Sequence, residues 1–346
     1  MLAICIECSH QRGMGHLFRA LNLIRALEER GKTEGADYIL LVNEDQTAEK
    51  ILREQGITPR LVDLTERRAD WEGALIRKAG ITVWLNDRLD TTAESAAHVK
   101  AAGCRLFTID DRGEGAALAD GNFASLAFEQ TEEIPGRKVY AGCRYLILNQ
   151  EIALHRRLRT KPEKILVTLG GSDTYGVTLR VIDFLKRRRR QQAEVAEWEK
   201  QAEITILLGP GSVIRQEAEA AVRGTNFALV SSVPSLPAFF AGFDFAVTGG
   251  GVTAFEAAAS GLPCMIIANE YHEVQIGKYL ESRGCAIFAG YHKEMDLGRI
   301  GRISDLALMS RRGMEAVDLA GADRICQILL PGSLPAGLNE DEEENV

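Results

Sequence analysis

The sequence predicts an α/β protein built from two parallel-sheet domains. Short apolar runs alternate with amphipathic helical segments in both halves of the chain, which is typical of parallel strands joined by helical crossovers. Turns that contain glycine follow strand-like runs in both halves. The length of 346 residues is long for one domain and comfortable for two.

Each half of the chain is expected to fold as its own domain. The alternation loosens around 121–151 and restarts with the apolar run 165–169, so we place the boundary near 158–164. Ligands of such sheets bind at the carboxyl ends of the strands, and we expect the two domains to face each other across a cleft. We predict an N-terminal Rossmann-like domain over 1–158, a C-terminal Rossmann-like domain over 159–332, and an acidic, disordered tail over 333–346.

Composition and charge favour a cytoplasmic protein. The net charge of −8 argues against a nucleic-acid partner, because phosphate backbones are bound by basic surfaces. The longest apolar runs are a few residues, so we expect no integral membrane segment, and Met1 leads into a strand-like run instead of a signal peptide. The seven cysteines are scattered, and no set of His, Cys and carboxylates has metal-site spacing. We therefore expect reduced thiols, no metal and no cofactor.

Three consecutive glycines, Gly249, Gly250 and Gly251, separate an apolar run from a helix that begins near Val252. Glycine lets the backbone approach an anion closely, and the unpaired N–H groups of the first helical turn then point at that anion. Thr253 and Glu256 lie three residues apart and share one helix face. A carboxylate there can accept two sugar hydroxyls. The alternative is a tight turn with an exposed helix face, but the combination favours a nucleotide-diphosphate site.

A second candidate site follows the first strand. Gly13 and Gly15 allow close approach of the backbone to a ligand, and His16 is expected at a helix N-terminus. The positive end of the helix favours a neutral imidazole that can take a proton. Arg19 follows one turn later with a fixed charge for a phosphate or carboxylate. The alternative is a helix cap and a surface charge; the position at the end of a strand favours function.

The second domain has an equivalent turn after the run 165–169. Small residues and free N–H groups in such a turn suit a diphosphate or the sugar beyond it. The alternative is a Ser/Asp turn that caps the following helix. The residues of this turn are Gly170, Gly171, Ser172 and Asp173.

Together these segments resemble a known group of proteins. The order Gly-x-Gly-His-x-x-Arg, Gly-Gly-Ser-Asp, then Gly-Gly-x-Thr-x-x-Glu with Gly-Leu-Pro is similar to the UDP-sugar hydrolase of pseudaminic-acid biosynthesis and the related spore-coat polysaccharide proteins. More distantly it resembles the GlcNAc transferase of peptidoglycan synthesis. The resemblance spans nearly the whole chain and includes Ile109-Asp110-Asp111.

The resemblance implies a GT-B fold, a UDP-sugar ligand and no metal. It also suggests that the final helix crosses back to brace the first domain. In the hydrolase, the histidine that His16 matches positions and activates water. The glutamate that Glu256 matches holds the ribose.

One segment departs from the family pattern. Where the hydrolases usually have Asn-Gln ahead of the last helix, this chain has His272 and Glu273, followed by Gln275. An amide pair would hydrogen-bond sugar hydroxyls, whereas a His-Glu pair changes both charge and polarity. We therefore expect these residues to contact a different sugar.

The leading hypothesis is a metal-independent hydrolase of a UDP-activated amino or deoxy sugar. Water activated by His16 would attack the anomeric carbon and release UDP, in the synthesis of surface polysaccharide or nonulosonic acid. One alternative is a glycosyltransferase of the same architecture, in which another hydroxyl replaces water. Another is a non-catalytic protein that binds nucleotide sugars, although binding alone needs no titratable group at position 16.

Overall fold

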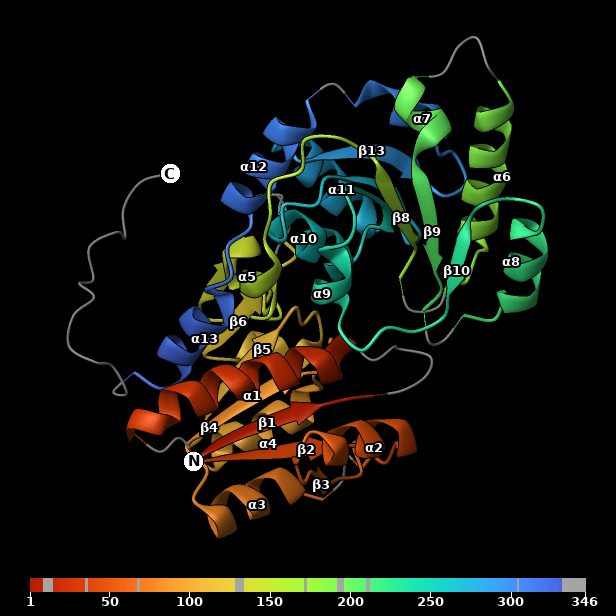
Figure 1. Ribbon diagram of the computed structural model, residues 1–346. Coiled ribbons are helices and arrows are strands. Elements are labelled where there is room, and N and C mark those ends of the chain that lie inside the picture. The colour runs from red at the N-terminus through yellow and green to blue at the C-terminus, as the bar shows by residue number, and fades with distance from the viewer. Residues whose placement is uncertain are drawn as a thin grey trace.

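The computed structural model contains two parallel sheets, each covered by helices (Figure 1). The alternation along the sequence predicted this arrangement, and the structure confirms it. The structure describes residues 1–8, 15–34, 37–66, 69–127, 134–170, 173–191, 196–209, 212–303 and 305–331. No helix in these ranges is long and apolar enough to cross a membrane.

The first sheet has seven parallel strands in the order β3-β2-β1-β4-β5-β6-β7. Its strands are β1 (Leu2–Ile6), β2 (Tyr38–Val42), β3 (Arg60–Leu61), β4 (Val83–Asp87), β5 (Arg105–Ile109), β6 (Gly121–Ala124) and β7 (Val139–Ala141). The helical segments of this part of the chain are α1 (Gly15–Glu34), α2 (Gln46–Glu54), α3 (Trp71–Ala79), α4 (Ala93–Ala101), η1 (Glu114–Leu118), η2 (Cys143–Tyr145) and α5 (Ile152–His155).

The second sheet has six parallel strands in the order β10-β9-β8-β11-β12-β13. Its strands are β8 (Lys164–Thr168), β9 (Glu203–Leu207), β10 (Ala228–Val230), β11 (Phe245–Gly249), β12 (Cys264–Ala268) and β13 (Ala286–Tyr291). Its helical segments are α6 (Val177–Arg190), α7 (Glu197–Gln201), α8 (Arg215–Val222), α9 (Leu236–Phe240), α10 (Val252–Ala259), α11 (Glu273–Ser282), η3 (Leu297–Arg302) and α12 (Leu306–Ala316), before the final helix α13 (Gly321–Leu329).

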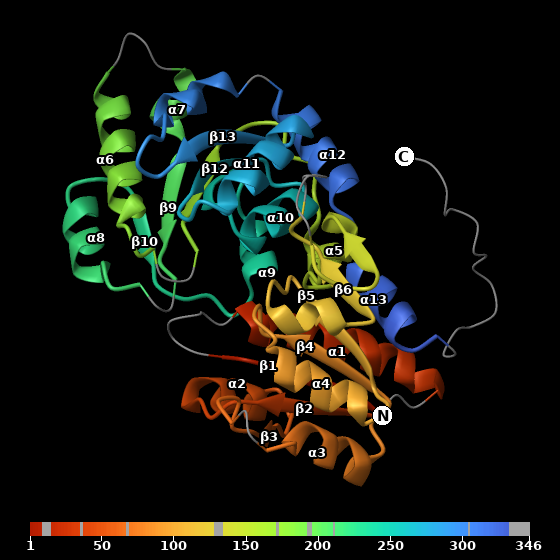
Figure 2. The same cartoon turned by 180° about the vertical axis from the view of Figure 1, so that it is seen from behind.

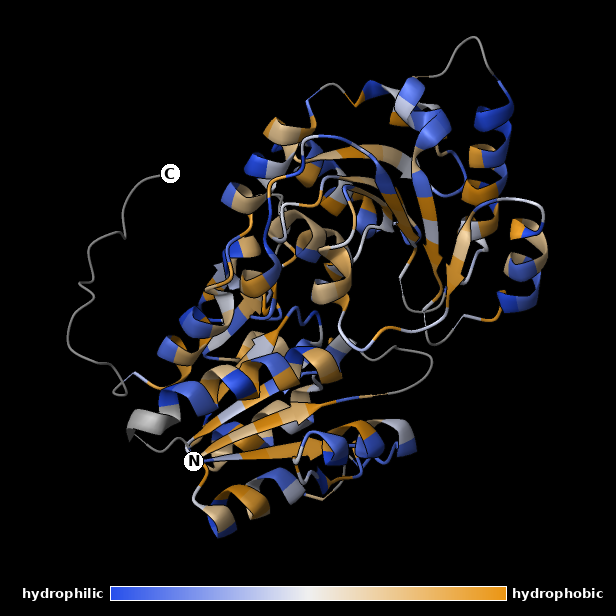
Figure 3. Ribbon diagram, viewed as in Figure 1, coloured by the Kyte–Doolittle hydropathy of each residue, from blue (hydrophilic) through white to orange (hydrophobic). Residues whose placement is uncertain are grey.

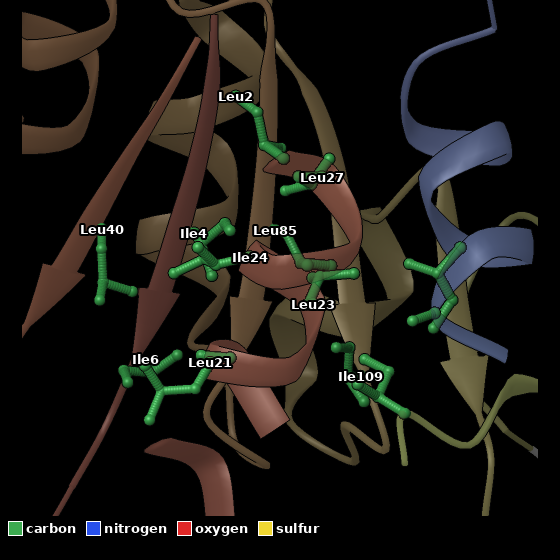
Figure 4. Close-up of a cluster of buried hydrophobic side chains, with 14 of the residues drawn as sticks. Leu2, Ile4, Ile6, Leu21, Leu23, Ile24, Leu27, Leu40, Leu85 and Ile109 are labelled. Atoms are coloured by element: carbon green, nitrogen blue, oxygen red, sulfur yellow. The ribbon is translucent and has the colours of Figure 1, made fainter. Parts of the chain in front are cut away.

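Helix α1 packs its apolar face on the first sheet, as the spacing of its leucines and isoleucines predicts. Leu21, Ile24 and Leu27 are buried against strand β1, every residue of which is also buried (Figure 4). Gly31 does not end this helix, which continues to Glu34. One glycine costs a helix only about 1 kcal/mol, less than the packing of the preceding turns contributes.

Hydropathy follows this layering throughout the described chain. In Figure 3 the strands are predominantly hydrophobic, whereas the helices show hydrophilic residues on their outer faces. The carboxyl ends of β8 and β9 point towards the first domain in Figure 1. The second sheet therefore presents to the first domain the edge at which ligands of parallel sheets bind.

The final helix crosses back to the first domain, as the resemblance suggested (Figures 1 and 2). Ile325 and Leu329 of α13 are buried in the core of the first sheet. The guanidinium of Arg105 donates to the carbonyl oxygen of Leu329 over 2.6 Å. Conversely, Leu148 and Ile152, which precede the predicted boundary, pack in the core of the second domain. The domain limits themselves stay a prediction.

A short arginine-rich linker ties the second domain together. Arg159 is completely buried and donates to the carbonyl oxygens of Phe240, Phe243 and Ser260. Phe240 is the last residue of α9 and Ser260 is the C-cap of α10. A cation therefore occupies the negative ends of two helices whose last carbonyls lack partners within the helix. This fixes the orientation of α10, whose other end carries the glycine turn.

We expect Arg159→Met to destabilise the protein by about 3 kcal/mol or more, because buried carbonyl groups lose their donors. The measurement is urea unfolding. Arg53→Met is the control, since Arg53 is exposed on α2 and makes only a surface ion pair with Glu49. If Arg159→Met lowers the free energy of unfolding no more than Arg53→Met does, Arg159 does not have this role.

Candidate functional site

His16 lies in the first turn of α1, at the edge of the first sheet where the carboxyl ends of its strands lie. The residue is 6% exposed, and Nδ1 is 2.6 Å from Oδ1 of Asp87. Asp87 ends β4, and it pairs in register with Ile6 at the end of β1. If Nδ1–H donates to Asp87, the imidazole retains Nε2 as a proton acceptor. Sequence and topology together therefore place a buried Asp–His pair at the carboxyl edge.

The buried carboxyl of Asp87 is held in its charged form by its neighbours. Burial opposes ionisation, but the charge of Arg19 and the hydrogen bonds from His16 and Arg19 lower its pKa below the ordinary value. Nε of Arg19 donates to Oδ2 of Asp87 over 2.7 Å, and Nη2 donates to Oδ1 of the same residue. This two-point contact fixes the plane of the carboxylate that bonds His16.

Arg19 is bound by carboxylates of the protein itself. Its Nη1 also donates to Oδ2 of Asp110 over 2.7 Å. Burial opposes the charge of Arg19, but Asp87 and Asp110 raise its pKa. The side chain that we expected to meet a phosphate or carboxylate of the substrate thus already bridges two carboxylates, and its contact with a substrate stays a prediction.

Asp110 extends this network from the end of the next strand, β5. It accepts from Oγ of Ser125 over 2.9 Å and from the N–H of Leu126 over 3.2 Å. Asp110 and Leu89, which follows β4, both have positive φ, at 48° and 70°. Residues other than glycine rarely adopt this conformation, and they cluster at functional sites. Two neighbouring strand ends therefore hold strained backbone beside the Asp–His pair.

The glycine turn in the second domain leads directly into α10. Gly249 ends β11, and Gly251 caps α10 without any hydrogen bond from a side chain. The N–H groups of the first turn are therefore not taken by a capping side chain. A Cβ on Gly250 would lie 2.7 Å from Cβ of Glu273. Gly250 is thus also required by the close packing of the turn against α11.

Thr253 and Glu256 are both half-buried on α10. Among the described residues, none donates a hydrogen bond to the Glu256 carboxyl. Burial raises the pKa of Glu256 to about 7. A half-buried carboxyl without a charged partner can accept hydroxyl donors from a ligand, and perturbed groups of this kind mark candidate sites.

The turn after β8 contains an occupied helix cap. Asp173 is buried, and its carboxylate accepts from the N–H groups of Val177 and Thr178 at the start of α6, over 2.8 and 2.9 Å. The capping role that we left open is therefore present, while a substrate contact stays a prediction. Gly170 has a φ of +92° and open space where a Cβ would stand. Gly171 and Ser172 of this turn, and Gly13 of the first, lie outside the described residues.

The segment that departs from the family pattern forms the start of α11. His272 is the exposed N-cap, and Gln275 is half-buried one turn inside the helix. Oε2 of Glu273 accepts from the N–H groups of Asn269 and Glu270, over 2.7 and 3.3 Å. Glu273 therefore closes the loop between β12 and α11, directly beside Gly250.

Sequence reasoning missed Asp87, and it assigned no role to Asp110. The signal was present, because Asn86-Asp87 and Asp110-Asp111 are polar residues that close apolar runs. Polar side chains at the carboxyl ends of parallel strands converge at one edge. The pairing with His16 was not visible, because it joins residues 71 positions apart.

The structure also brings together three side chains that could bind a metal, and none of them belongs to the candidate site described above. Ligand atoms of Asp70, Glu72 and His98 all lie within 4.8 Å of one another. Asp70, however, caps α3 through Gly73 and pairs with Arg77. These contacts already engage the carboxylate, so the group is explained by helix packing.

Comparison with known proteins places the chain by its fold. No family model matches it. The spore coat polysaccharide biosynthesis protein SpsG of Bacillus subtilis is 20% identical over 306 residues, covering 84% of this chain and 83% of that protein. The similarity extends along both domains.

Two solved structures show the same architecture. MurG of Acinetobacter baumannii superposes with a TM-score of 0.67 at 13% identity, covering 95% of this chain and 99% of that one. The UDP-GlcNAc 2-epimerase of Neisseria meningitidis, bound to UDP-GlcNAc, gives 0.60 at 12% identity, covering 96% and 100%. The chain thus has the GT-B fold of two Rossmann-like domains that the sequence predicted.

We expect Glu256→Gln to stabilise the protein above about pH 7. The folded protein holds the proton up to a pKa of about 7, whereas the unfolded chain releases it near the ordinary pKa of 4.5. Wild-type stability therefore falls as pH rises between these values. The gain should be roughly 1 to 2 kcal/mol at about pH 8 and near zero at about pH 4, allowing for solvent screening.

Urea unfolding at the two pH values measures this difference. Glu217→Gln, at an exposed position on α8, gives the baseline for loss of one surface charge. Equal effects of the two substitutions at both pH values would contradict the raised pKa of Glu256.

Proposed function

We propose that the protein is a hydrolase of a UDP-activated sugar. The observation that carries this proposal is the buried Asp87–His16 pair, which leaves a basic nitrogen at the edge where ligands bind. The uncapped start of α10 supports it, because a helix N-terminus suits a diphosphate. The comparisons add that the relative carries a polysaccharide-biosynthesis name, and that a structural neighbour was solved with UDP-GlcNAc.

In the proposed reaction, Nε2 of His16 accepts a proton from water. The water oxygen forms a bond to the anomeric carbon, and the bond from that carbon to the diphosphate oxygen breaks. UDP departs with the bonding electron pair, and N–H groups at the start of α10 stabilise its charge. Asp87 holds the imidazole in one orientation and stabilises the imidazolium that forms. The products are UDP, the free sugar and a proton.

The second domain is proposed to hold the nucleotide. Glu256 accepts the two ribose hydroxyls, Thr253 lies on the same helix face, and the diphosphate rests on Gly249–Gly251. Gly170 supplies backbone that a ligand can approach closely, since a Cβ there would meet open space. We place the reaction in the cytoplasm, which the seven free cysteines support.

A glycosyltransferase is the second candidate, and an observation on the first domain favours it. Phe18 and Leu89 are 52% and 41% exposed, and they lie two residues from His16 and Asp87 respectively. Exposed apolar side chains on the segments that carry His16 and Asp87 suit an acceptor with an apolar part. Incubation with a panel of UDP-sugars, with and without acceptors, separates the two: release of free sugar without acceptor indicates hydrolysis.

We expect His16→Asn to lower turnover by about 10²–10⁴-fold with near-normal affinity for UDP, because general-base catalysis contributes that much. Asn keeps a polar group of similar size. Asp87→Asn should also lower turnover, by about 10²-fold or more, since the imidazole loses its orienting partner. UDP release and a melting curve are measured for each variant. If the His16→Asn protein is stable and fully active, another residue must activate the water, and His272 is the next candidate.

Glu256→Ala should weaken UDP binding by roughly 1–3 kcal/mol, the usual loss when a charged hydrogen-bond partner is removed. Wild-type affinity should also fall as pH drops below about 7, where the carboxyl takes up a proton. Calorimetry with UDP tests both effects. Unchanged affinity in the variant would rule out Glu256 as the ribose contact.

A further inference from the structure

The carboxylate of Glu273 borders the glycine turn that is proposed to hold the diphosphate. Its Cβ and carbonyl oxygen lie 2.7 and 3.0 Å from the place where a Cβ of Gly250 would stand. Its Oε1 lies 3.7 Å from the corresponding place at Gly251, the N-cap of α10. A negatively charged group of the protein therefore stands beside the glycine turn that is proposed to bind a negatively charged ligand.

The two oxygens of this carboxylate have different surroundings. Oε2 accepts from the N–H groups of Asn269 and Glu270, which fixes the side chain in place. Oε1, on the side of Gly251, accepts no hydrogen bond from any residue that the structure describes. One oxygen is thus structural, and the other is an open acceptor at the turn.

A diphosphate alone would meet like charge at this position. A carboxylate and a phosphate within a few ångströms of each other repel, and the repulsion is strongest where water is excluded. The conflict is removed if the ligand places a cation between them. An ammonium group has three donors and a positive charge, so it can bond Oε1 and the diphosphate together.

We propose that Glu273 selects a nucleoside-diphosphate sugar that carries a free amino group. This inference rests on the proposed binding of a UDP-sugar and adds the chemistry of the sugar. A hydroxyl would satisfy Oε1 as a hydrogen-bond donor but would leave the two negative charges uncompensated. An acylated amine would lack the charge as well, and it would bring an acceptor oxygen of its own towards the carboxylate.

The matched pair UDP-glucosamine and UDP-N-acetylglucosamine tests the proposal, with UDP alone as a third ligand. Binding is measured by calorimetry at a pH where the amine is protonated, in protein carrying His16→Asn so that the ligand is not consumed. Glu273→Gln is the informative variant, because its amide oxygen can still accept from Asn269 and Glu270. Glu270→Gln is the control: it removes a charge from the same loop, from a carboxylate that accepts from Tyr175.

The expected result is that protein with Glu273 intact binds UDP-glucosamine about tenfold tighter than UDP-N-acetylglucosamine, because one charge-assisted hydrogen bond contributes roughly that much. In Glu273→Gln this preference should fall to within about twofold, and UDP itself should bind several-fold tighter because the like charge is gone. Glu270→Gln should keep the preference. A melting curve confirms that the variants are folded.

Two results would overturn the inference, and they are distinguishable. If UDP binds but Glu273→Gln leaves the ratio of the two affinities unchanged, Glu273 only closes its loop and the UDP site stands. If UDP does not bind to the protein with Glu273 intact, nor to Glu273→Gln, the proposed function fails and the inference fails with it.

Discussion

The candidate site depends on one buried carboxylate with two partners. Asp87 orients the imidazole of His16 and neutralises Arg19 at the same time. Its position follows from topology, because β4 pairs with β1 and their ends lie in register. Burial would make such a carboxylate costly without partners, so the three side chains stabilise one another's charge state and geometry. A change at any one of them leaves the other two incorrectly paired.

The second domain achieves its geometry through backbone and packing. Arg159 and its neighbours bind the carbonyl ends of α9 and α10, and α11 packs on the glycine turn at the other end of α10. Both ends of α10 are thereby held. A short helix fixed in this way presents its first N–H groups without a mobile side chain as cap, which is the preorganisation that binding of a charged ligand requires.

Sequence patterns predicted the parts of this arrangement that are local. Strand-helix alternation predicted the two sheets, and a histidine after a strand predicted one member of the candidate site. Asp87 escaped notice because its importance arises from a contact across 71 positions of sequence, set by strand order. The ends of helices are harder to predict than their presence. Helix α1, for example, passes through Gly31, because tertiary packing outweighs the low helix propensity of one glycine. The capping role of Asp173 was an open alternative, because the spacing Asp-x-x-x-Val fits a cap and a ligand turn alike.

The distribution of charge restricts how this fold can hold an anion. Arg19 is the basic residue closest in sequence to the proposed catalytic histidine, yet two carboxylates compensate its charge. At the proposed diphosphate turn, oriented N–H groups supply positive potential, and their partial charges are small. Glu256 remains mostly protonated below its pKa of about 7, so at such pH it adds little negative charge near the turn. Glu273 imposes the opposite condition, so a ligand that brings its own positive charge is the one that this turn accommodates with least repulsion.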